Sequence, residues 1–146
     1  MSKTIVLATD HAGFELKEHV KNYLQSKGYN IKDFGALKYD SLDDYPDFII
    51  PAAKHVAEHN LIGIIFGGSG QGEAMAANRV KGIRAAVFYN GPGEIVELSR
   101  MHNNANILSI GARFLSNHEA ESVIELWLST DFEEGRHEKR INKLDS

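Results

Sequence analysis

The chain lacks cysteine, long apolar runs and an excess of positive charge, and each absence excludes a class of protein. Without cysteine there can be no disulfide, thiolate zinc site or cysteine nucleophile. No apolar run approaches the roughly 20 residues that a membrane-spanning helix needs, so we expect no membrane partner. Lysine and arginine total 16 against 20 acidic residues, a formal charge of -4. Because surfaces that bind nucleic acid are usually basic, we expect no nucleic-acid partner.

The composition is typical of an ordinary globular protein. Hydrophobic residues make up 42% of the 146 positions and charged residues 25%, which suits one domain with one core. The N-terminal residues lead directly into a strand pattern, so we expect no signal peptide and a cytoplasmic protein. We predict a single domain over residues 1–146, ending in a charged tail at 131–146.

Segments with strand character alternate with segments of helical character. Short apolar, β-branched runs predict strands at 4–8, 29–34, 61–66, 83–89 and 105–110. Helical spacing and turn residues predict helices at 14–27, 46–58, 92–101 and 117–128, with another opening near 74 and Asn117 as a cap. This alternation predicts an α/β fold with a parallel sheet covered on both faces. In such folds ligands bind beyond the carboxyl ends of the strands.

The glycine-rich segment 67–73, with sequence GGSGQGE, follows the third predicted strand and opens a helix. It is no dinucleotide fingerprint, because Glu73 stands where a glycine is needed, and it lacks a phosphate-loop lysine. Clustered glycines can turn backbone N–H groups toward one anion, and the helix N-terminus adds positive potential. Glu73 beside such a surface suits proton removal next to a carbonyl. The alternatives are a tight turn and a carboxylate that merely favours the helix N-terminus.

Other polar residues also follow predicted strands or helices. Asp10 and His11 follow the first strand, His102 follows the fourth helix, and Arg113 follows the fifth strand. We expect these loops to meet at one edge of the sheet, although each residue alone could be a cap or a surface charge. In the tail, positions 136 and 140 share a helix face, and two arginines there suit phosphate. A solvated tail paired with its own glutamates is the alternative.

His55 to His59 matches the inverted zinc-peptidase pattern H-x-x-E-H. Helical spacing would place both histidines on one face. The segment ends a helix just before a strand, however, at the opposite edge of the sheet from the loops described above. A short pattern of this kind also arises easily by chance. We therefore expect no metal at these residues.

Several long motifs, spread across nearly the whole chain, lie at residues 10–17, 44–47, 67–73, 76–79, 82–85, 99–106 and 135–140. In sequence and in order they resemble the motifs of the type B ribose-5-phosphate isomerases and the related galactose-6-phosphate and allose-6-phosphate isomerase subunits. The resemblance implies a Rossmann-like α/β/α sandwich with a five-stranded sheet. It also implies a homodimer or homotetramer whose active sites are shared between subunits.

Many members of that family carry a catalytic cysteine where this chain has Gly67, and another branch uses a glutamate at the position of Glu73. The chain is therefore similar to the glutamate branch. The implied reaction is aldose–ketose isomerisation of a phosphorylated sugar, without cofactor or metal. Ribose 5-phosphate is the expected substrate, and allose 6-phosphate or another sugar phosphate is an alternative. A non-catalytic sugar-phosphate-binding protein is the competing class.

The resemblance also implies roles for individual residues. Glu73 would transfer the proton, His102 with Asp10 would open the sugar ring, and Ser69 with Asn103 would orient hydroxyl groups. His11 and Arg113 would bind phosphate together with tail arginines supplied by the neighbouring subunit. The remaining residues expected at the substrate are Tyr45, Gly68, Gly70, Gly72, Arg136, His137 and Arg140.

Overall fold

The computed structural model describes residues 3–146 and contains one sheet of five parallel strands in the order β2-β1-β3-β5-β4. Apolar residues dominate its three central strands, which are buried on both faces, as expected for a parallel sheet. The strands are β1 (Thr4–Thr9), β2 (Asn30–Asp33), β3 (Ile62–Gly67), β4 (Ala85–Phe88) and β5 (Ile107–Gly111).

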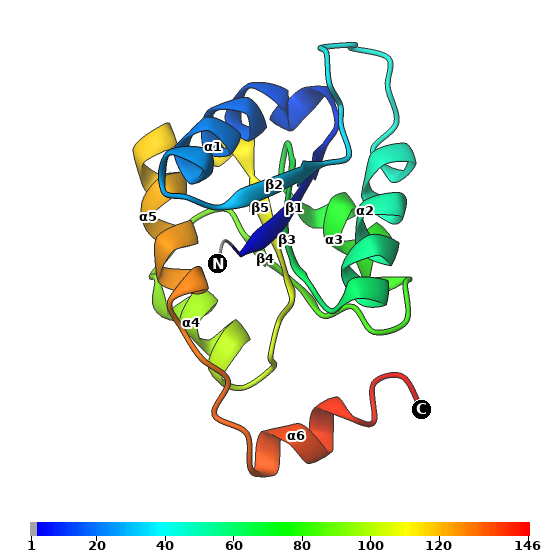
Figure 1. The fold of residues 1–146 in the computed structure, drawn as a ribbon, viewed down its shortest axis with the longest axis vertical. Coiled ribbons are helices and arrows are strands. Elements are labelled where there is room, and N and C mark those ends of the chain that lie inside the picture. The colour runs from blue at the N-terminus through cyan, green and yellow to red at the C-terminus, as the bar shows by residue number, and fades with distance from the viewer. Residues whose placement is uncertain (1–2) are drawn as a thin grey trace.

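Helices cover both faces of the sheet and form a three-layer sandwich (Figure 1). One core lies beneath α1 (Phe14–Ser26), α4 (Glu94–Met101) and α5 (Asn117–Leu128), and the other beneath α2 (Pro46–His59) and α3 (Gln71–Asn78). Short helices η1 (His11–Gly13) and η2 (Ala112–Phe114) follow β1 and β5. The last helix, α6 (Arg136–Ile141), lies away from the sandwich, beyond the end of α4 (Figure 1).

The predicted α/β sandwich is confirmed, and the predicted helix and strand ends agree within a few residues. One detail is wrong: Ser116, not Asn117, caps α5. The Ser116 hydroxyl accepts from the Glu119 N–H at 3.1 Å, while the Glu119 carboxylate accepts from the Ser116 N–H at 2.9 Å. This reciprocal pair is a capping box, so Asn117 becomes the first helical residue. Across residues 3–146, none of the helices has the length and apolarity that crossing a membrane requires.

The order of the strands determines where a site can form. From β1 the chain moves to β2 on one side, then crosses back to β3 on the other side, so the order reverses between β1 and β3. Ligands of open α/β sheets bind at the carboxyl edge beside such a reversal. At this edge Thr9 pairs with Phe66, and Gly67 pairs with Gly111. The loops after β1, β3 and β5 therefore meet there.

Candidate active site

The Glu73 side chain lies directly over the backbone of Gly67. A Cβ atom on Gly67 would overlap Cδ and both carboxylate oxygens of Glu73. Glu73 occupies the first turn of α3, and the residue is only 5% exposed. The missing side chain at position 67 thus provides the space that the carboxylate fills. This packing links two residues that the sequence alone relates only by their spacing.

Burial raises the pKa of Glu73, and the nearby negative charge of Asp10 raises it further. A hydrogen bond from its own backbone N–H lowers the pKa but does not cancel the effect of burial. Asp10 is itself buried at the end of β1 and accepts a hydrogen bond from the Ala12 N–H at 3.0 Å. A carboxylate with a raised pKa is a stronger base than an exposed glutamate and is suited to proton abstraction.

The rest of the glycine-rich loop forms a tight, polar rim around Glu73. Gly70 has a φ of +79°, which favours glycine, and its carbonyl accepts from the Ser109 hydroxyl at 2.6 Å. The Ser69 hydroxyl accepts from the Gln71 N–H at 3.3 Å. The Tyr45 ring packs against Gly72, where a Cβ would lie 2.9 Å from the ring. Because N–H groups of a helix's first turn lack helical acceptors, this rim can stabilise an oxyanion.

Beside the loop lies a cavity of about 390 Å³ lined by His11, Arg113 and four neighbouring residues. The Arg113 backbone N–H donates to the Gly68 carbonyl at 3.0 Å, and a Cβ on Gly68 would lie 3.1 Å from the Arg113 guanidinium. Arg113 is therefore held against the glycine-rich loop. An imidazole and a guanidinium in one open cavity are suited to bind a phosphate.

Asp43 holds His11 in place through two hydrogen bonds to the same oxygen. Its Oδ1 accepts from the His11 backbone N–H at 3.0 Å and lies 2.7 Å from the His11 Nδ1. The hydrogen bond to Asp43 raises the pKa of His11, although the small desolvation of the ring opposes it. The arrangement leaves Nε2 free for an anion. Sequence reasoning missed Asp43, because nothing local relates it to a residue 32 positions away.

His102 lies at the opposite edge of the sheet from Glu73. Helix α4 runs back from the carboxyl end of β4, so His102 at its end lies near the start of β5. The neighbouring Asn104 carbonyl accepts from the Arg84 side chain, just before β4 begins. Our expectation that this loop meets the others at one edge is therefore wrong within a single chain. Asn103 lies at this amino edge too, exposed beside a cavity of about 400 Å³.

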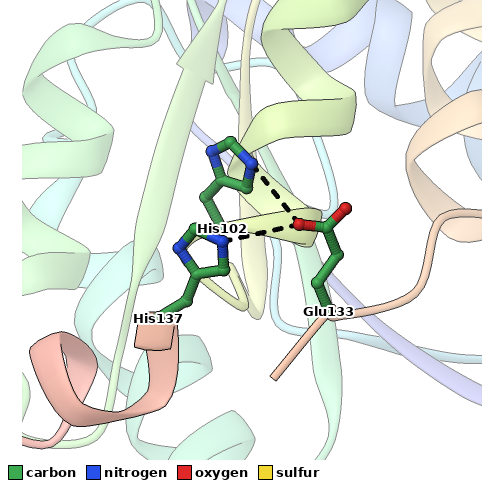
Figure 2. A group of neighbouring side chains, drawn as sticks. All are labelled: His102, Glu133 and His137. Carbon is green, nitrogen blue, oxygen red and sulfur yellow. Dashed lines mark ion pairs between the residues drawn. The ribbon is translucent and has the colours of Figure 1, made fainter. Parts of the chain in front are cut away.

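His102 forms a cluster with Glu133 and His137 (Figure 2). Its Nε2 lies 3.5 Å from Glu133 Oε1, and the His137 Nε2 lies 3.4 Å from the same oxygen. The two imidazole rings stack with centroids 4.2 Å apart. The Glu133 backbone N–H donates to the Met101 carbonyl, which ties the tail to the end of α4. The sequence predicts the tail glutamates only as partners of the tail's own basic residues, and Glu133 does pair with His137. Its contact with His102 was not predicted.

The tail arginines lie on α6 with this cluster, not with His11 and Arg113. Arg136 and Arg140 are exposed and line a cavity of about 370 Å³ with two lysines. The structure therefore divides the predicted site residues into two groups. Those at the carboxyl edge are Asp10, His11, Tyr45, Gly68, Ser69, Gly70, Gly72, Glu73 and Arg113, and those near the amino edge are His102, Asn103, Arg136, His137 and Arg140.

Known proteins resemble this chain over almost its full length. The model of the Ribose/Galactose Isomerase family matches residues 5–144. Ribose-5-phosphate isomerase B of Mycolicibacterium paratuberculosis is 42% identical over 142 residues, which cover 96% of this chain and 88% of that protein. A probable ribose-5-phosphate isomerase B of Mycoplasma genitalium is 38% identical over 146 residues, covering 99% and 95%.

Solved structures agree with the sequence comparisons. A ribose 5-phosphate isomerase from Thermotoga maritima has a TM-score of 0.92 at 42% identity and covers 99% of both chains. Ribose-5-phosphate isomerase B from Mycoplasma genitalium with bound ribulose-5-phosphate also has a TM-score of 0.92, at 38% identity, and covers 99% of this chain and 95% of that chain. The fold, the match along the chain and the glycine-rich loop lead to one conclusion: this chain belongs to the ribose/galactose isomerase family.

Proposed function

We propose that the protein interconverts ribose 5-phosphate and ribulose 5-phosphate through a cis-enediolate, with Glu73 as the base. The observation that carries the proposal is the buried Glu73 carboxylate, seated on Gly67 at the first turn of α3. The bound ribulose-5-phosphate of the Mycoplasma genitalium relative supports the choice of substrate. As an enzyme of sugar-phosphate metabolism, the protein would work in the cytoplasm.

In the proposed reaction Glu73 removes the proton from C2 of the open-chain aldose. The electrons of the broken C–H bond form the C1–C2 double bond, and the C1 oxygen becomes negative. Those backbone N–H groups at residues 69–73 that have no other acceptor stabilise this oxygen, a contribution worth on the order of 3 kcal/mol per donor in other enzymes. Glu73 then delivers the proton to C1, and the C2 hydroxyl proton passes to the C1 oxygen, which completes the ketose. Burial, with a smaller contribution from the charge of Asp10, raises the pKa of Glu73.

The second group of residues would come from a neighbouring subunit. Arg136 and Arg140 lie on the protruding helix α6 (Figure 1), where they can reach a second copy of the chain. They would complete the phosphate site that His11 and Arg113 begin. His102 from the same neighbour would open the sugar ring, and a homodimer is the smallest assembly that provides both groups.

Replacing the base tests the proposal most directly. Glu73→Gln keeps the size of the side chain and removes its ability to accept a proton, so turnover should fall by about 100-fold or more. The matched control is Glu58→Gln, an exposed glutamate on α2, which should retain full activity. Turnover is measured as ribulose 5-phosphate formed from ribose 5-phosphate. Near-normal turnover of the Glu73 variant would reject its role.

Hydrogen exchange separates an isomerase from a sugar-phosphate-binding protein on the same fold. In deuterium oxide, the proposed enzyme incorporates deuterium at C1 of the ketose product, because the enediolate exchanges its proton with solvent through Glu73. A binding protein forms no ketose and exchanges nothing. Testing allose 6-phosphate in the same assay decides between the pentose and hexose substrates.

A further inference from the structure

The His102–Glu133–His137 cluster contains a buried ring nitrogen that has no hydrogen-bond partner. The His137 side chain is only 7% exposed, and its Nε2 forms no hydrogen bond to any residue the structure describes. Buried polar atoms are normally satisfied, so an orphaned one requires an explanation. The ligand atoms of all three side chains lie within 4.8 Å of one another. Figure 2 shows both imidazoles directed toward the Glu133 carboxylate.

The spacing of the cluster fits a metal ion better than a hydrogen bond. The two N···O separations are 3.5 Å and 3.4 Å, whereas good N–H···O bonds measure about 2.7–3.2 Å. Zinc ligands lie about 2.0–2.1 Å from the metal at tetrahedral angles, which separates neighbouring ligand atoms by roughly 3.4 Å. The two observed N···O separations are therefore close to the spacing of neighbouring zinc ligands.

Burial of one ring and exposure of the other determine how the site would close. The imidazoles stack with an interplanar angle of 15°, so one ring must turn before both nitrogens face one ion. The His137 ring is buried, but the His102 side chain is 38% exposed and follows the last residue of α4. Glu133 is 47% exposed as well. Rotation of His102 therefore closes the site from the solvent side, which also provides an entry path.

The chemistry of the three ligands favours a borderline divalent cation. The neutral imidazole is the form that binds a metal ion. Two imidazoles and a carboxylate suit Zn²⁺, while Mg²⁺ prefers oxygen ligands. Glu133 supplies the negative charge that offsets Arg136.

We propose that His102, Glu133 and His137 form a binding site for Zn²⁺, with a fourth position open to solvent. Occupation of the site would withdraw His102 from the reaction and inhibit the enzyme. This consequence rests on the proposed function, whereas metal binding itself does not. A second group, Asp10, His11 and Asp43, also brings ligand atoms together. There the His11 Nδ1 already lies 2.7 Å from Asp43 Oδ1, which is a hydrogen-bonding distance, although Asp43 Oδ2 is buried without a partner.

Isothermal titration calorimetry of the metal-free protein with Zn²⁺ tests the site. We expect one ion per chain in the native protein, and an affinity at least about tenfold lower in both His137→Gln and Glu133→Gln. The matched control is His55→Gln. His55 also packs against a second histidine, His59, with ring centroids 4.1 Å apart, and this variant should bind zinc normally. Circular dichroism confirms that each variant is folded. Absence of stoichiometric binding, or unchanged affinity in both cluster variants, would overturn the site.

Activity measurements then test the consequence. Zinc should inhibit isomerisation by the native protein, a chelator should restore it, and Glu133→Gln should need roughly tenfold more zinc for the same inhibition. Zinc that binds at the cluster without inhibiting would overturn the inhibitory role alone. A native protein that isomerises no sugar phosphate would reject the proposed function, and calorimetry would still decide whether the metal site exists.

Discussion

Glu73 holds a carboxylate inside the protein, and this affects its activity and its stability in opposite directions. The base must be ionised to act, and burial raises its pKa. The acid limb of the pH profile for kcat/KM should therefore lie at higher pH than an exposed glutamate would give. The measurement is the initial rate between pH 4 and about 9. An acid limb at the pH of an ordinary glutamate would contradict the assignment of this limb to Glu73.

The same raised pKa predicts how Glu73 changes folding stability. Between the unfolded and folded pKa values the native state binds more protons, so the free energy of unfolding contributed by Glu73 falls as pH rises. At neutral pH the ionised carboxylate is thus destabilising. Glu73→Gln should raise the melting temperature at pH 7 by a few degrees, which corresponds to a gain on the order of 1 kcal/mol in the free energy of unfolding. The rise should be smaller at pH 4. Thermal unfolding at both pH values measures this difference, and a lower melting temperature at pH 7 would contradict it.

Gly67 provides a second test at the level of single residues. A Cβ at this position overlaps the end of the Glu73 side chain, which is flexible and can move aside. Gly67→Ala should therefore displace the carboxylate and lower turnover about 100-fold, while the melting temperature changes by only a few degrees. The double variant with Glu73→Gln should be no less active than Glu73→Gln alone, because both changes remove the same base. If the losses of turnover in this double-mutant cycle are additive, Gly67 acts in another way.

At the level of elements, the segment between β2 and α2 supports the phosphate-binding end of the site. The Thr9 N–H donates to the Gly35 carbonyl at 2.7 Å, and the Ala36 N–H donates to the Thr9 carbonyl at 2.8 Å. The fully buried Lys17 donates to the Ala36 carbonyl at 2.8 Å and pairs with Asp33. These contacts hold the segment against the end of β1, which brings Asp43 to His11.

Asp43→Asn tests what this segment contributes. The variant keeps the size of the side chain and an oxygen that can accept from His11, but it loses the negative charge that strengthens this hydrogen bond and raises the pKa of His11. Above neutral pH, His11 should then be less protonated and should bind phosphate less well. We expect KM for ribose 5-phosphate to rise roughly two- to five-fold at pH 8, the range of an exposed ion pair, and to change little at pH 5.5.

The control for Asp43 is Asp47→Asn, an exposed aspartate in the first turn of α2. It should leave KM unchanged at both pH values. NMR titration of the His11 ring gives an independent measurement, because its pKa should fall in the Asp43 variant only. An unchanged His11 titration would show that Asp43 does not control the charge of the imidazole.

Most elements and Glu73 could be predicted from the sequence because their signals are local. Apolar runs, turn residues and the glycine-rich segment each lie within a short stretch of chain. The position of His102 was mispredicted because the residues that follow a helix resemble those that follow a strand. A helix between parallel strands returns to the amino edge, however, so the topology itself places His102 there. The contact of Asp43 with His11 depends on distant segments meeting, and no local pattern encodes it. Glu133 is four residues from His137, so that pairing is local, but its contact with His102 also depends on distant segments.

For the whole molecule, the predicted site residues lie in two groups at opposite edges of the sheet, so we expect that neither group is sufficient for activity without the other. If each site combines Glu73 of one subunit with His102 of another, an inactive Glu73→Gln chain and an inactive His102→Asn chain can rescue each other. In a mixed dimer, one site carries both substitutions and the other carries neither. When equal amounts of the two chains are denatured together and refolded, random pairing makes half of the dimers mixed. Because only one of the two sites in each mixed dimer is native, about one quarter of native activity should be recovered. Each variant refolded alone should remain inactive, and a mixture no more active than its parts would show that Glu73 and His102 do not serve one shared site.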